Sequence, residues 1–159
     1  MRVIILIGIF MIPTLIGTIL SSSVQKRRKQ LELLCEICVD ISQSIRYKNS
    51  TIPEILEYIL DNDRYKLMRF SNSNSANDIA ISFTNSDKCY LNKNEKDELV
   101  TYFSMLGSTD SEGQIQLCER YKLYFHQQLN HTDEDDRKKR KLYYSLGVFS
   151  GLFLVVILF

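Results

Sequence analysis

The chain has 159 residues, of which 45% are hydrophobic and 25% are charged, with 20 basic and 19 acidic side chains. So many apolar residues exclude a disordered chain, and a net charge of +1 argues against nucleic acid as the main partner. Two prolines and six glycines exclude a collagen-like protein, and four cysteines without regular spacing exclude a disulfide scaffold. Apart from Arg2, every charged residue lies between Lys26 and Lys141, so both ends are uncharged.

Both uncharged ends have the length of a membrane helix. Residues 3–20 and residues 142–159 each contain 18 residues without a charged side chain. At about 1.5 Å per residue, each run covers about 27 Å, close to the hydrocarbon core of a bilayer. We predict a transmembrane helix over each run. The first is expected to be retained, because a basic cluster follows it and no A-x-A cleavage site is present. In the second, Gly147 and Gly151 have the GxxxG spacing that lets membrane helices pack closely.

Basic clusters flank the middle of the chain on both sides. The first follows residue 20 and the second precedes residue 142; their members are Lys26, Arg27, Arg28, Lys29, Arg137, Lys138, Lys139, Arg140 and Lys141. The positive-inside rule therefore places residues 21–141 in the cytoplasm and both termini outside, in a two-pass cell-membrane protein. The second cluster would also suit anionic lipid headgroups, although setting the topology alone explains it.

The cytoplasmic segment has the periodicity of helices. Apolar residues at intervals of three and four predict a helix over residues 27–48. Thr51 and Pro53 predict the start of a second helix, and a similar short helix is expected around residues 65–70. Between residues 71 and 93 the pattern is weakest. There we expect a polar loop and then a short helix near residues 79–83, because a lone strand would have no partner.

Two longer helices are predicted after this region. The first covers residues 95–106 and is ended by Gly107, and Ser108, Thr109 and Asp110 supply caps for the second. Four acid–base pairs at i,i+4 spacing between residues 133 and 140 each stabilise a helix by about 0.2–0.5 kcal/mol. Residues 130–141 are therefore expected to form a charged helical rod that continues into the second anchor; the alternative is a break at Thr132, which can cap a new helix. The predicted fold is all-α, a cytoplasmic helical bundle between two transmembrane helices.

Residues with catalytic or metal-binding chemistry are sparse. Cys35 and Cys38 lie in an apolar helical stripe, which favours core packing over a redox or metal site. His126 and His131 are five residues apart and have no clustered ligands around them. No glycine-rich phosphate loop is present. We therefore expect a non-enzymatic protein without cofactor or metal; the competing hypothesis is a membrane enzyme that uses the cysteine pair or His126.

Three stretches resemble the stage III sporulation protein AB family of endospore-forming bacteria. They are YKNSTIPEIL at residues 47–56, LGSTD at residues 106–110 followed by Gln114, and YSLGVFSGL at residues 144–152. In the first stretch, two isoleucines stand where the family usually has Leu and Ala. The resemblance covers nearly the whole chain, with the three stretches in the family's order.

The resemblance implies a platform-like subunit of a channel complex between mother cell and forespore, in the mother-cell membrane around the forespore. The family's cytoplasmic domain is similar to helical domains of the inner-membrane platform protein of type II secretion and type IV pilus machines. The implied partners are other stage III sporulation proteins, especially protein AA, which resembles a secretion ATPase, together with membrane lipid and further copies of the chain in a homo-oligomer. The function would be to couple that ATPase to the channel. The alternative is a general two-anchor membrane adaptor that recruits a cytoplasmic partner outside sporulation.

The candidate site is the predicted corner between two helices. It consists of Leu106, Gly107, Thr109, Asp110 and Gln114. One interpretation is a capping motif that only fixes the angle between the helices. The other is a docking surface for a partner. The sequence leaves both open, and Asp110→Asn separates them because asparagine also caps helices.

Overall fold

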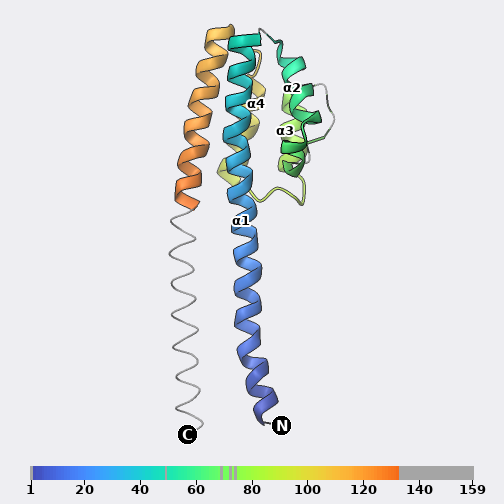
Figure 1. Cartoon of the computed structure of the whole chain (residues 1–159), viewed down its shortest axis with the longest axis vertical. Helices are drawn as coiled ribbons and strands as arrows, with labels where there is room; N and C mark the ends of the chain where they lie inside the picture. Colours follow the sequence, from blue (N-terminus) through green and yellow to red (C-terminus); the bar gives the residue numbers. More distant parts are fainter. Residues whose placement is uncertain (1, 49, 69, 72, 74, 133–159) are drawn as a thin grey trace.

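The structure is a computed structural model in which the described residues are 2–132 except 49, 69, 72 and 74, with side chains described from residue 23 onward. These residues form α1 (Arg2–Lys48), α2 (Ile52–Asp61), the 3-10 helix η1 (Asp63–Met68), α3 (Ala76–Thr84) and α4 (Lys93–Met105). A further helix covers residues 111–132 (Figure 1). Within the described residues there is no strand, so the predicted all-α fold is confirmed for this part.

Helix α1 is a single unbroken element of 47 residues. It includes the helix predicted over residues 27–48 and passes without interruption through the predicted domain boundary at residue 20. The backbone therefore joins the first predicted membrane span directly to the bundle, as one helix (Figure 1).

The two predicted membrane spans fall outside the residues whose side chains are described. Residues 3–20 belong to the first part of α1, and residues 142–159 follow residue 132, as does most of the predicted charged rod. Over the part of the chain that is described, no helix combines the length and apolar character needed to cross a membrane.

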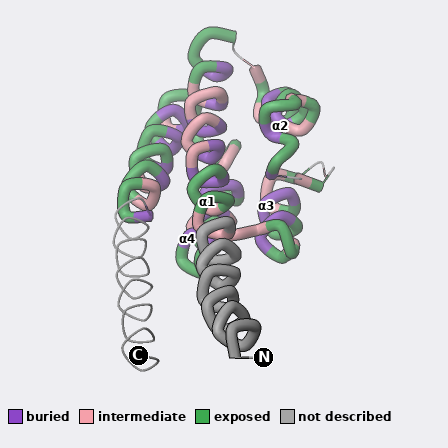
Figure 2. The backbone as a smooth tube through the Cα atoms, turned by 60° about the horizontal axis from the view of Figure 1, so that its bottom comes forward, coloured by how far each residue is buried: buried purple, intermediate pink, exposed green. Residues whose placement is uncertain are grey.

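Helix α1 is the central helix of the bundle. The helix of residues 111–132 runs antiparallel on one side of it, and α2, η1 and α3 lie on the other (Figure 1). Helix α4 runs in the same direction as α1 and contacts both α3 and the helix of residues 111–132. The buried positions of residues 30–45 lie on one wide face of α1 (Figure 2), and the opposite face is half-buried or exposed.

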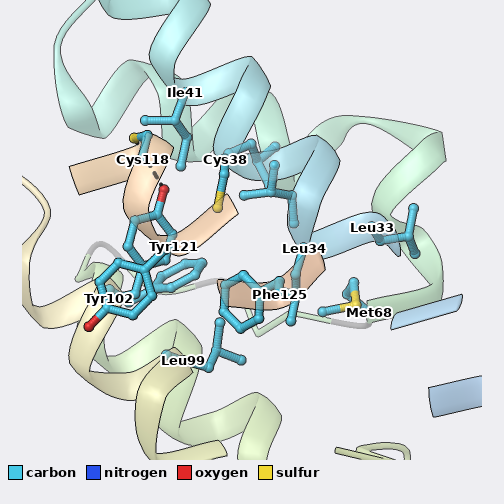
Figure 3. Close-up of a cluster of buried hydrophobic side chains, with 14 of the residues drawn as sticks. Leu33, Leu34, Cys38, Ile41, Met68, Leu99, Tyr102, Cys118, Tyr121 and Phe125 are labelled. Carbon is cyan, nitrogen blue, oxygen red and sulfur yellow. Dashed lines mark hydrogen bonds between the residues drawn. The ribbon is translucent and has the colours of Figure 1, made fainter. Parts of the chain in front are cut away.

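The core is built from aliphatic residues of α1 and aromatic residues of the later helices. From α1, buried members include Leu34, Cys38 and Ile41; α4 and the helix of residues 111–132 add Tyr102, Tyr121 and Phe125 (Figure 3). The rings of Tyr102 and Tyr121 are 4.7 Å apart between centroids. Burying such side chains contributes about 1.5–3 kcal/mol each relative to leaving them in water, which holds the bundle together without any disulfide among the described residues.

The short elements differ in detail from the sequence predictions. The predicted helix near residues 79–83 is confirmed as α3. At the start of α2, the Glu54 carboxylate accepts the Thr51 backbone N–H at 2.9 Å, and Pro53 lies in the first turn as predicted. The helix expected around residues 65–70 is instead the tighter η1, which starts where the Asn62 side chain accepts the Arg64 backbone N–H. Helix α4 begins two residues earlier than predicted, after an Asn92 cap.

Candidate partner-binding corner

The corner starts where α4 ends at Met105. Gly107 has a φ of +81°, a backbone conformation that favours glycine because an L side chain there would be strained. The backbone N–H and hydroxyl of Ser108 both donate to the Met105 carbonyl, at 3.2 and 2.7 Å. The Met105 carbonyl at the end of α4 is thus satisfied inside a tight reversal, and the chain leaves the helix in a fixed direction.

A buried glutamine holds the corner together. Gln114 is 3% exposed, and its side-chain oxygen accepts the Gly107 backbone N–H at 3.1 Å. Its amide nitrogen donates to the Thr109 hydroxyl at 2.9 Å and to the Met105 carbonyl at 3.3 Å. One side chain therefore bonds the end of α4, the glycine and the loop at once. Three of the predicted site residues, Gly107, Thr109 and Gln114, are brought together by these bonds.

Asp110 caps the following helix. Its carboxylate accepts the backbone N–H of Gly113 at 3.1 Å, the third position of the helix of residues 111–132. Gly113 is closely surrounded: a Cβ atom there would lie 2.7 Å from the Thr109 hydroxyl and 2.8 Å from the Asp110 carboxylate. The geometry therefore supports the capping interpretation, and it leaves the docking interpretation open because the Asp110 side chain is also exposed.

The corner lies at the end of the bundle farthest from the first predicted membrane span. A Cβ on Gly107 would be 3.7 Å from Ile52, the first residue of α2, so the corner adjoins the connection that follows α1 (Figure 1). Residues 107–112 are all exposed there, whereas Leu106 packs partly against the core. Residues 105–114 include two acidic and no basic residues, so this segment is negatively charged, with the Arg120 guanidinium 3.9 Å from the Met105 sulfur beside it.

The other predicted residues are divided between the described and undescribed parts. Gly147, Gly151 and the second basic cluster lie outside the described residues. In the first cluster, Lys29 and Arg28 form exposed ion pairs with Glu32, at 3.3 and 3.4 Å.

Arg27 has a role that the sequence did not predict. Its guanidinium binds the carboxylate of Glu95 through two atoms, at 2.6 and 3.1 Å, and the Glu95 side chain is completely buried. The same carboxylate accepts the Asn92 backbone N–H at 2.8 Å and thereby caps α4. The Asn-x-x-Glu spacing is a capping-box signal visible in the sequence, but the pairing with a residue 68 positions away is not.

The cysteines pack as small apolar side chains. Cys38 is buried, with Tyr102 nearby; the Tyr102 hydroxyl is 3.3 Å from the sulfur of Cys118 (Figure 3). Burial raises the pKa of the Cys35 thiol to about 11 and raises the pKa values of Cys38 and Cys118 as well. These thiols are therefore protonated near neutral pH, which disfavours nucleophilic or redox chemistry.

The histidines show no catalytic arrangement in the described residues. The Nδ1 atom of His126 is 3.4 Å from the side-chain nitrogen of Asn130, one turn along the same helix. His131 is exposed. Across the part of the chain that the structure describes, there is no group of three or more His, Cys, Asp or Glu side chains that could hold a metal ion.

Comparison with known proteins gives one result. Residues 2–159 match the model of the family described as stage III sporulation protein AB. The chain belongs to this family. A search of curated proteins and a search of solved structures found no match. The resemblance inferred from three short stretches is thus confirmed over essentially the whole chain.

Membership of the stage III sporulation protein AB family gives the protein a sporulation-related role. This family is not a known enzyme family. It suggests that the partners of the protein are other sporulation proteins, and that its location is the membrane between mother cell and forespore.

Proposed function

We propose that this member of the stage III sporulation protein AB family is a non-enzymatic, platform-like subunit of the channel complex between mother cell and forespore. Residues 3–20 and 142–159 anchor it in the mother-cell membrane, with residues 21–141 in the cytoplasm. It couples a cytoplasmic secretion-type ATPase, stage III sporulation protein AA, to the channel. The alternative of an adaptor outside sporulation is disfavoured by the family to which the chain belongs.

The observation that carries the proposal is the continuity of α1. A platform must transmit force or position between a membrane and a cytoplasmic motor, which requires a stiff connection. Helix α1 is unbroken from Arg2 to Lys48 and lies at the centre of the bundle. From residue 20 to residue 48 an α-helix rises about 42 Å, so the corner of residues 106–114 would stand well clear of the bilayer.

The corner is the proposed contact for the ATPase. It lies at the exposed far end of the bundle, and its shape is fixed by the Gln114 hydrogen bonds rather than left to fluctuate. Preorganised surfaces bind with less loss of conformational entropy. Because residues 105–114 carry acidic and no basic side chains, the complementary surface of the partner is expected to be basic.

Binding of purified protein AA to the full chain in lipid nanodiscs tests this proposal. Asp110→Asn removes the charge and keeps most of the capping ability, so a weakening of binding by about tenfold with unchanged helicity is expected. Asp61→Asn is the matched control, because Asp61 is an exposed acidic residue at the end of α2, outside the corner. Equal affinities for the wild type and both variants would contradict docking at the corner.

A further inference from the structure

Two segments far apart in sequence are fastened together at the end of the bundle nearest the first predicted membrane span. The Gln30 side chain donates to the Lys88 carbonyl at 2.7 Å and accepts the Tyr90 backbone N–H at 2.9 Å. Lys26 donates to the Tyr90 hydroxyl at 3.2 Å, and its ammonium lies 4.9 Å from the centre of the ring. The loop of residues 86–92 is therefore fixed in place against α1.

This end of the bundle is strongly basic. Residues 25–32 and 86–96 together contain seven basic and three acidic residues. Of the three acidic residues, Glu95 is completely buried against Arg27, so its charge is not presented to solvent. Lys26, Lys88 and Lys93 are exposed. At the opposite end, residues 46–61 and 105–114 contain two basic and five acidic residues, so the charge changes sign along the axis of the bundle.

The distances along α1 bring the basic end within reach of lipid headgroups. From residue 20, Lys26 is about 9 Å farther along the helix and Gln30 about 15 Å. The headgroup layer adds roughly 5–8 Å beyond the hydrocarbon core, and charges interact over a Debye length of about 8 Å at physiological salt. The backbone carbonyl of Lys88 is bonded to Gln30, so the Lys88 ammonium is close enough for electrostatic attraction to an anionic membrane surface.

We propose that the loop of residues 86–92, the start of α4 and the adjoining turns of α1 form a basic collar that binds the anionic phospholipid surface around the first anchor. The collar consists of Lys26, Arg28, Lys29, Lys88 and Lys93. Its ligand is the phosphate-bearing headgroup layer, which positive side chains on a preformed loop complement in charge. The collar rests on the proposed anchor at residues 3–20, and it does not depend on binding of an ATPase at the corner. It would orient the bundle on the membrane so that the acidic corner faces away.

The test is lysine acetylation of the full chain in nanodiscs, followed by mass spectrometry of each lysine. One sample contains phosphatidylcholine alone and the other also contains phosphatidylglycerol. In the anionic nanodiscs, acetylation of Lys88 and Lys93 is expected to slow by about fivefold, and high salt is expected to restore it. Lys48, exposed at the far end of α1, and Lys66, exposed in η1 beside the middle of α1, serve as internal controls and should react equally in both samples.

Equal rates at Lys88 and Lys93 in the two lipids would overturn the proposal, and so would slowing of every lysine alike. Inorganic phosphate added to the neutral nanodiscs is a further arm: if it protects these lysines as well as the anionic lipid does, the loop binds small anions rather than a membrane surface. Failure of the chain to stay in the nanodisc removes the anchor and also overturns the collar. Loss of ATPase binding at the corner leaves the acetylation pattern unchanged, so the two proposals fail separately.

Discussion

Replacing Arg27 with methionine tests how the bundle is held to the base of α1. The change removes the cation that binds Glu95 through two atoms, at 2.6 and 3.1 Å, and leaves a completely buried carboxylate without its partner. Breaking a buried ion pair in this way costs about 3–5 kcal/mol. Because the Arg27 side chain is 24% exposed, water reaches part of the pair, and we expect a loss of about 3 kcal/mol.

For a chain of this size, 1 kcal/mol corresponds to about 2–4 °C in Tm, so Arg27→Met should lower the Tm by about 6–12 °C. The assay is thermal unfolding of the full chain in detergent, followed by circular dichroism. Lys29→Met is the matched control: it removes the same charge two residues away, from an exposed pair worth less than about 1 kcal/mol.

A double variant separates the buried charge from general damage. Glu95→Gln keeps the capping box and removes the charge, so Arg27→Met combined with Glu95→Gln should be more stable than Arg27→Met alone by about 1 kcal/mol or more. Two results would contradict a stabilising role of the Arg27–Glu95 pair between α1 and α4. One is a fall in Tm for Arg27→Met no larger than that for Lys29→Met, and the other is a double variant no more stable than Arg27→Met.

Three further predictions concern the corner, a buried phenol and the thiols. Gln114→Leu removes three hydrogen bonds and should lower the free energy of unfolding by about 2–3 kcal/mol, with faster amide exchange at the corner; unchanged exchange would contradict this. Burial and a hydrogen bond to Asp40 raise the pKa of the Tyr65 phenol above its ordinary 10.0, so the folded chain keeps a proton that the unfolded chain loses. The free energy of unfolding should therefore fall as pH rises above about 10, and Tyr65→Phe should flatten that fall; identical pH profiles would refute it. Near neutral pH, a thiol reagent should modify half-buried Cys35 slowly, because its raised pKa leaves about a hundredfold less thiolate than a cysteine of ordinary pKa would have. Buried Cys38 should react more slowly still, and faster labelling of Cys38 than of Cys35 would be inconsistent with its burial.

Helix positions were predictable because each amphipathic run carries its own period. The stripe on residues 27–48 correctly indicated Leu34, Cys38 and Ile41 as core residues. It did not indicate Leu33 and Ile37, which are also buried and widen the same face, since a local period cannot reveal how wide a face the other helices cover. That width depends on contacts with helices far along the chain.

The corner was predictable in outline and not in its interior. Gly107 and Asp110 could be predicted from residue type alone, because glycine favours a positive φ at the end of a helix and aspartate favours the N-cap of the next one. The bonds from Gln114 to Met105 and Gly107 depend on how two helices cross, and no local pattern predicts them. The pairing of Arg27 with Glu95 also depends on contacts between distant helices and was not predicted. In the sequence, the positive-inside rule alone explains a basic residue beside a predicted membrane span.

The central claim is that this member of the stage III sporulation protein AB family works as a membrane platform whose corner docks a partner. Its most direct test is a count of heat-resistant spores in a deletion strain complemented with the wild type or with Asp110→Asn. We expect a large fall on deletion, restoration by the wild type, and little restoration by Asp110→Asn, although that variant accumulates normally in the membrane. Full restoration by Asp110→Asn would reduce the corner to a capping motif, and an unchanged count on deletion would contradict the sporulation role itself.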